Sequence, residues 1–177
     1  MRTFAFLFAA ALAASAPAGR VAAQTAAPAS APVPGPPGVG GTPMVVPLPH
    51  LAITQALLAG VPRTTIGAVE EDGKTASYSG VVLDALLIKS GAPHGEGLRG
   101  KAVADYVLVT ASDGYRAVFA LVELDARFSD KMVLLADRRN GAPLDAKDGP
   151  FRIVVPDEKH HARWVRNVTQ IDVLSPP

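Results

Sequence analysis

The feature that most constrains the fold is a strand, turn and strand pattern between residues 134 and 164. Asn140 and Gly141 separate two apolar runs, and both residue types tolerate the positive φ angles of a tight turn between paired strands. Another apolar run at residues 151–155 follows a Pro-containing connection. A loop of mixed charge then leads to the chain's single Trp. The pattern predicts paired strands joined by short turns.

The rest of the chain after residue 50 predicts more strands than helices. Alternation and turn residues predict further strands in addition to the one at 151–155. These lie just before Tyr78 and at residues 63–69, 102–110, 115–121, 132–137 and 168–174. Short helices are expected at 54–59, 81–90 and 122–128, and Ser79 is the expected N-cap of the second. We therefore expect an α+β domain with a mixed or mainly antiparallel sheet and short helices.

The N-terminal part of the chain has two compositions that differ from the rest. Residues 1–23 combine an Arg at position 2, an apolar run and small residues before Gln24, which is typical of a secretory signal peptide. Residues 24–49 are dominated by Ala, Pro and Gly, and such a tract cannot offset its ordering entropy by burying apolar groups. We expect a signal peptide, a disordered linker and a domain at 50–177. The mature protein is then periplasmic or secreted, with no transmembrane segment after signal removal.

Charge and cysteine content narrow the classes of function. The net charge is +1, from 17 basic and 16 acidic residues, and aromatic residues make up 6% of the chain. Nucleic acid is therefore not the expected partner, because neither a basic field nor a set of stacking rings is present. The chain has no Cys, so its stability must come from the apolar core although exported proteins often carry disulfides.

Four sequence features resemble a known family in their order along the chain. They are Tyr78-Ser79-Gly80-Val81 with a following Leu pair, Asp113-Gly114-Tyr115, the Asn140-Gly141 turn with Pro143-Leu144, and Arg152 to Pro156 followed by a basic residue before Trp164. In this order the features resemble the oxidoreductase molybdopterin-binding domain, which is the sulfite-oxidase-like family. The resemblance covers roughly residues 60–174. It implies a sulfite-oxidase-like molybdopterin-binding fold, a molybdopterin-type cofactor and a molybdopterin-dependent oxidoreductase activity.

Two departures from that family concern its chemistry. Catalytic members hold molybdenum through a Cys thiolate, and this chain has no Cys. The chain also lacks the longer N-terminal half that supplies much of the cofactor cradle. The resemblance therefore provides neither a catalytic residue nor a metal ligand, and any bound cofactor has no protein thiolate.

The loop at residues 157–166 holds the candidate cofactor-binding residues Lys159, His160, His161, Arg163 and Trp164. Arg offers a planar fork to phosphate, Lys offers a point charge, and an indole offers a face on which a heterocycle can stack. In the resembled family the corresponding loop borders the pterin and its phosphate. The alternative is a solvated loop in which Trp164 is a buried anchor of the core.

Other constellations predict structure rather than chemistry. Ser79 lacks the Gly-x-Ser-x-Gly context of a nucleophile, and the adjacent His160 and His161 do not supply the four ligands of a closed zinc site. Asp148 is of a type that turns favour, and Asp113 and Tyr115 are interpreted as hairpin residues rather than catalytic ones. Two functions stay open at this level. The first is an exported molybdopterin-binding-domain protein that takes a small anionic or pterin-like ligand. The second is a non-catalytic periplasmic binding or interaction module that keeps the fold without the cofactor.

Overall fold

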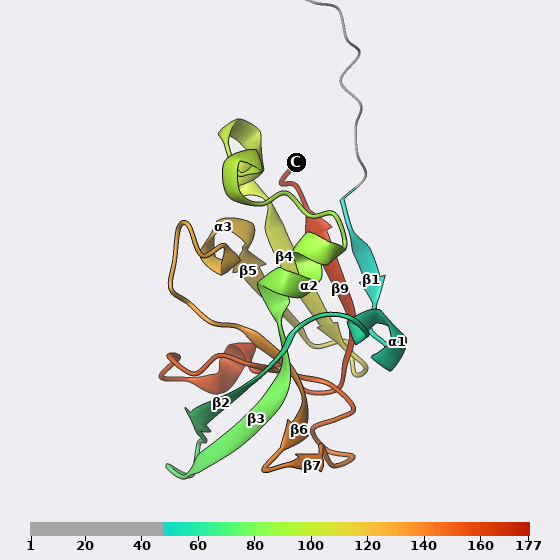
Figure 1. Cartoon of the computed structure of the whole chain (residues 1–177), viewed down its shortest axis with the longest axis vertical. Helices are drawn as coiled ribbons and strands as arrows, with labels where there is room; N and C mark the ends of the chain where they lie inside the picture. The colour runs from blue at the N-terminus through green and yellow to red at the C-terminus, as the bar shows by residue number, and fades with distance from the viewer. Residues whose placement is uncertain (1–47) are drawn as a thin grey trace, which may run out of the picture. The chain divides into compact units, whose positions relative to one another are not determined.

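The computed structural model describes residues 48–177, and these form two antiparallel sheets joined by short helices (Figure 1). The first sheet has the strand order β1-β9-β4-β5, and the second has the order β2-β3-β6-β7 with β8 also paired to β6. The strands of the first sheet are β1 (His50–Ala52), β9 (Val168–Leu174), β4 (Tyr106–Ala111) and β5 (Arg116–Ala120). Those of the second are β2 (Arg63–Val69), β3 (Thr75–Val82), β6 (Leu134–Arg139), β7 (Ala142–Pro143) and β8 (Arg152–Val154). This sheet-rich α+β architecture confirms the predicted fold class.

The helices are few and short. They are α1 (Gln55–Leu58), α2 (Leu83–Lys89) and α3 (Leu121–Leu124), and three 3₁₀ turns accompany them at η1 (Gly95–Gly97), η2 (Gly100–Ala104) and η3 (His161–Arg163). No helix within residues 48–177 has the length and apolar character needed to cross a membrane. The predicted signal peptide at 1–23, and the linker at 24–49 except for its last two residues, lie outside the described residues.

Helix α2 packs its apolar face into the common core. Leu83, Leu86 and Leu87 recur at helical spacing and are at most 1% exposed, whereas Ile88 on the opposite face is 38% exposed. The same core contains Tyr78 from β3 and residues of β6, β8 and β9. Burial of these apolar side chains is the main source of stability in a domain without disulfides.

A glycine allows two strands of the second sheet to approach closely. The register of β3 on β6 shifts between Ser79 and Gly80. A Cβ atom placed on Gly80 would lie 2.1 Å from the backbone oxygen of Leu135, and backbone cannot move aside as a side chain can. Gly80 therefore has a steric role in the sheet.

The Asn140-Gly141 turn is confirmed, with φ angles of 49° and 80°. Arg139 pairs with Ala142 across it, so the loop between β6 and β7 has two residues. Two positive φ angles in a two-residue hairpin loop match the backbone twist of the strands on either side. The Asn140 carboxamide also accepts the amide N–H of Ser77 at 2.9 Å, which fixes the turn against β3.

Some local predictions were wrong. Ser79 lies within β3 and shares a hydrogen bond with Thr65, while the N-cap of α2 is Val82, which has no side-chain cap. The helix expected at 122–128 is shorter in the structure, where α3 ends at Leu124. The chain turns after it because the Asp125 carboxylate accepts the amide N–H groups of Gly95 and Arg127. Residues 100–104, in part expected as strand, form the 3₁₀ turn η2.

Candidate functional site

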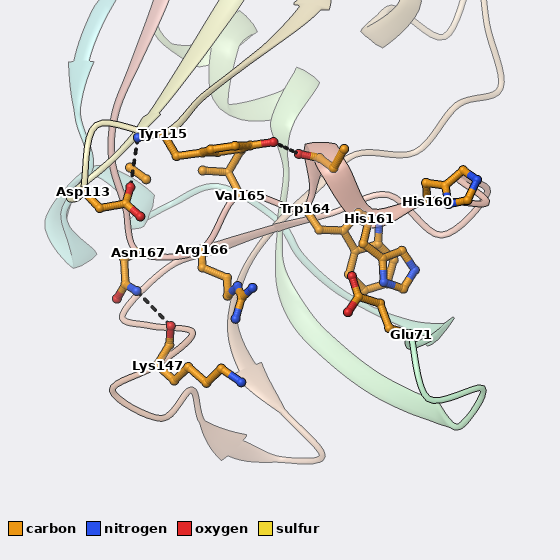
Figure 2. Close-up of a pocket in the computed structure, with 12 residues that line it drawn as sticks. Glu71, Asp113, Tyr115, Lys147, His160, His161, Trp164, Val165, Arg166 and Asn167 are labelled. Carbon is orange, nitrogen blue, oxygen red and sulfur yellow. Dashed lines mark hydrogen bonds between the residues drawn. The ribbon is translucent and has the colours of Figure 1, made fainter.

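A cavity of about 700 Å³ lies beside the loop at residues 157–167 (Figure 2). The β4–β5 turn, the segment before β8 and the tip of the β2–β3 hairpin complete its wall. Its lining includes Glu71, Tyr115, Lys147, His160, His161 and Arg166. The volume lies within the range of small-molecule sites, about 300 to 1,000 Å³.

Trp164 anchors the loop rather than presenting a free face to the cavity. Its side chain is 3% exposed and its indole N–H donates to the carbonyl of Val155 at 3.0 Å. The His161 ring stacks on the indole with centroids 3.8 Å apart and planes 19° from parallel, and Tyr78 meets the indole edge-on at 6.0 Å. A heterocycle in the cavity would therefore meet the imidazole of His161 first.

Tyr115 joins the β4–β5 turn to the loop. Its hydroxyl donates to the carbonyl of Ala162 at 2.6 Å, and its backbone N–H donates to the Asp113 carboxylate at 2.9 Å. The turn expected at Asp113-Gly114 is present, with Gly114 at a φ of 85°. The sequence predicted the turn for these residues but did not predict that Tyr115 forms part of a cavity wall.

A partly buried polar network lies beside the Trp164 ring. The Tyr78 hydroxyl donates to Glu70 at 2.5 Å, Arg139 also pairs with Glu70, and Arg152 pairs with Asp148 at 2.6 Å. Burial and the hydrogen bond to Glu70 raise the pKa of Tyr78 to about 12. Burial opposes the charged form of Glu70, but its bonds from Tyr78 and Arg139 outweigh that effect and lower its pKa. Glu70 therefore stays ionised at neutral pH while the Tyr78 hydroxyl stays protonated. The Arg152 guanidinium, 5.4 Å from the centroid of the Trp164 ring, connects this network to the loop.

Arg163 does not line the cavity. Its guanidinium donates to Glu158 at 2.7 Å and to Glu123 at 2.8 Å, and it lies 4.4 Å from the centroid of the Phe119 ring. Burial favours the neutral form, but the two carboxylates outweigh it and raise the pKa of Arg163. The structure thus gives Arg163 partners that fix the loop to α3. Its binding of a ligand stays a prediction.

The other predicted residues divide between two adjoining cavities. His160, His161 and Trp164 line the cavity of about 700 Å³, and Lys159, His160 and His161 line a neighbouring one of about 460 Å³. His160 and Lys159 are exposed, and His161 is half-buried. The loop therefore brings four of the five predicted residues to cavity walls.

Two cations that were not predicted as site residues also line the larger cavity. Lys147 comes from the turn before β8, and Arg166 follows Trp164 in the loop. Both also line a third, smaller cavity of about 270 Å³ that continues from the first. The sequence carries no signal for Lys147, because it is 19 residues from Arg166 along the chain and only the fold brings them to one wall.

The fold and the cavity define a sheet-rich domain with a pocket whose wall carries two imidazoles, two cations and the carboxylates of Glu71 and Asp113. Residues 61–177 match the family described as oxidoreductase molybdopterin binding domain. The chain therefore belongs to this family, as the order of its sequence features predicted. No curated protein is similar enough in sequence to be matched to the chain.

The residues present fit one end of a molybdopterin-type cofactor. The cavity combines an imidazole surface with Lys147 and Arg166, which suits a heterocycle that carries a phosphate. The metal end has no thiolate donor, because the chain contains no Cys. Among residues 48–177, no three His, Asp or Glu side chains come together as a metal site.

Proposed function

We propose that this chain is an exported domain that binds a molybdopterin-type cofactor, or a related pterin anion, in the cavity beside His161. The observation that carries the proposal is this cavity of about 700 Å³, whose wall includes His160 and His161 from the loop that the family resemblance singled out. The family match to residues 61–177 supports the same ligand class. Such a cofactor supplies the metal chemistry when bound, and the residues of this chain contact its pterin and phosphate.

The proposed role of the loop is to hold the ring. His161 is fixed by stacking on Trp164, and Trp164 is fixed by its hydrogen bond to Val155. A ring that is already immobilised loses little conformational entropy when a ligand stacks on it. The loop is in turn fixed by Tyr115 and Arg163, so the binding surface is formed before the ligand arrives.

Isothermal titration with a pterin phosphate tests the binding proposal. We expect heat from the wild type, and a loss of affinity of about two- to tenfold in His161→Ala, because an aromatic contact contributes about 0.5 to 1.5 kcal/mol. Lys101→Ala on η2 is the control, since Lys101 is exposed and lines none of the three cavities. No heat from a folded wild type would contradict the proposal.

A non-catalytic binding module is the second candidate, and the lack of Cys favours it. It keeps the fold and the loop but takes no pterin. A wild type that binds no pterin phosphate, and that carries no pterin when purified from a host that makes the cofactor, would support this candidate.

Export is the remaining part of the proposal. The basic start, apolar run and small residues of positions 1–23 predict cleavage after Ala23. Intact-mass spectrometry of the protein purified from an export-competent host is the measurement. A mature protein that still begins at Met1 would contradict this part.

A further inference from the structure

Lys147 and Arg166 differ from most other cations around the cavities because they form no close ion pair with a carboxylate among residues 48–177. Within residues 48–177, Lys147 forms no ion pair, and Arg166 has a single distant contact with Asp148 at 3.8 Å. Arg139, Arg152 and Arg163 are each paired closely with Glu or Asp. A cation that is already paired attracts a ligand anion less, so Lys147 and Arg166 keep more of their attraction.

Asp148 does not neutralise Arg166, because another Arg holds it more closely. Arg152 donates to Asp148 at 2.6 Å, and the Arg152 side chain is only 12% exposed. Arg166 is 49% exposed and lies outside that pair. Its guanidinium is therefore free to turn toward a ligand in the cavity.

Asn167 brings the two cations together. Its carboxamide donates to the carbonyl of Lys147 at 2.9 Å, and its backbone N–H donates to the carbonyl of Asp148 at 3.1 Å. The carbonyl of Asn167 accepts the N–H of Ser112 at 3.0 Å, which attaches the same point to the β4–β5 turn. Asn167 has a φ of 49°, a conformation that Asn tolerates better than most residues.

Among residues 48–177, the two carboxylates that line the larger cavity, Glu71 and Asp113, form no ion pair with Lys147 or Arg166. In Figure 2, Glu71 and His161 are drawn toward the right of the view, whereas Lys147 and Arg166 lie toward its left and extend from neighbouring loops. Asp113 accepts the N–H of Tyr115 at 2.9 Å and so is engaged by its own turn. Figure 2 thus shows the two imidazoles and the two cations on different parts of the cavity wall.

We infer that Lys147 and Arg166, positioned by Asn167, form a phosphate clamp that takes the phosphomonoester of the ligand. The inference rests on the proposed function for the identity of the ring, but the clamp itself selects the phosphate. Lys supplies a point charge and Arg a planar fork of donors, and both bind phosphate oxygens through charge-assisted hydrogen bonds.

The test compares a pterin phosphate, the same pterin without phosphate, and inorganic phosphate. These probes are titrated into the wild type, Lys147→Gln, Arg166→Gln and the control Lys101→Gln. We expect each clamp variant to lose about ten- to a hundredfold in affinity for the pterin phosphate, as expected for a charge-assisted contact. Affinity for the phosphate-free pterin should stay within about twofold. Wild-type binding of the phosphate form should also weaken between low salt and 0.15 M, where the screening length is about 8 Å.

Asn167→Gly tests the positioning role. Glycine adopts the positive φ without strain but cannot bond to Lys147. We expect a reduced preference for the phosphate form over the phosphate-free form, a ratio that a general loss of stability would not change. An unchanged ratio in this variant would overturn the role of Asn167.

The outcomes separate the clamp from the proposed function. Pterin phosphate binding that is unchanged in Lys147→Gln and Arg166→Gln overturns the clamp and leaves the pterin proposal standing. Inorganic phosphate binding that Arg166→Gln removes, with no affinity for either pterin, supports the clamp and overturns the pterin proposal. No binding of any probe by a folded wild type overturns both.

Discussion

Replacement of Arg163 by Ala should destabilise the domain, because this side chain connects three segments. Its guanidinium donates to Glu158 at 2.7 Å, to Glu123 at 2.8 Å and to the carbonyl of Val118 at 3.2 Å. It also lies 4.4 Å from the Phe119 centroid. The change therefore removes two ion pairs and a cation–π contact at once.

The magnitude follows from the exposure of these groups. The side chains of Arg163, Glu123 and Glu158 are 29%, 25% and 15% exposed, so each pair contributes more than a surface pair and less than a buried one. With about 1 kcal/mol for each pair and about 1 kcal/mol for the ring contact, the loss is about 3 kcal/mol. The melting temperature of a domain of this size should then fall by on the order of 10 °C.

Arg166→Ala is the matched control, because it removes the same side chain three residues further on. Arg166 is 49% exposed and has one contact at 3.8 Å, so its loss should change the free energy of unfolding by less than about 0.5 kcal/mol. Thermal and urea unfolding of both variants are the assays. Equal destabilisation of the two variants, or a neutral Arg163→Ala, would refute the assignment of Arg163 to structure.

Three further changes test the core and the electrostatics. Leu86→Ala should cost about 2 to 5 kcal/mol in urea unfolding because Leu86 is fully buried, while Ile88→Ala at 38% exposure should be nearly neutral; equal costs would show that the face of α2 is misassigned. Gly80→Ala should cost about 3 kcal/mol because its Cβ would lie 2.1 Å from the backbone oxygen of Leu135, and a melting temperature equal to that of the wild type would contradict this steric role. Burial opposes ionisation of Glu123, but bonds from Arg163 and Lys131 outweigh it and hold its pKa below the ordinary 4.5. The ion pairs of Glu123 therefore contribute fully to stability above pH 4.5, and this contribution is lost as the pH falls further. The difference in unfolding free energy between wild type and Glu123→Gln should then shrink at acid pH. A constant difference from pH 7 to pH 3 would contradict this prediction.

Local patterns predicted the strands and turns well. The strands at 63–69 and 168–174 were predicted with their observed bounds. Burial alternates along β2, whereas Ile171, Asp172 and Val173 of β9 are all buried, which fits the imperfect alternation of its sequence. The Asn140-Gly141 turn was also predictable, because residues that accept two adjacent positive φ angles are few. The three-residue strand β1 was not predicted, since so short a segment carries no readable period.

The candidate site was only partly predictable, because its parts meet through contacts distant in sequence. Composition located the cations of the loop but could not tell Arg163 from Arg166. The chain path through η3 decides which of the two meets Glu123 and which meets the cavity. The bond from Asn167 to the Lys147 carbonyl attaches the Lys147 segment to the loop, and no local pattern encodes that bond.

The most direct test of the account is the pterin content of the protein purified from an export-competent host that makes the molybdenum cofactor. Fluorescence of the oxidised pterin, calibrated against protein concentration, gives the ratio of ligand to chain. We predict close to one pterin phosphate per wild-type chain, with a reduced ratio in Arg166→Gln and an unchanged ratio in Lys101→Gln. A folded wild type that carries no pterin would contradict the account.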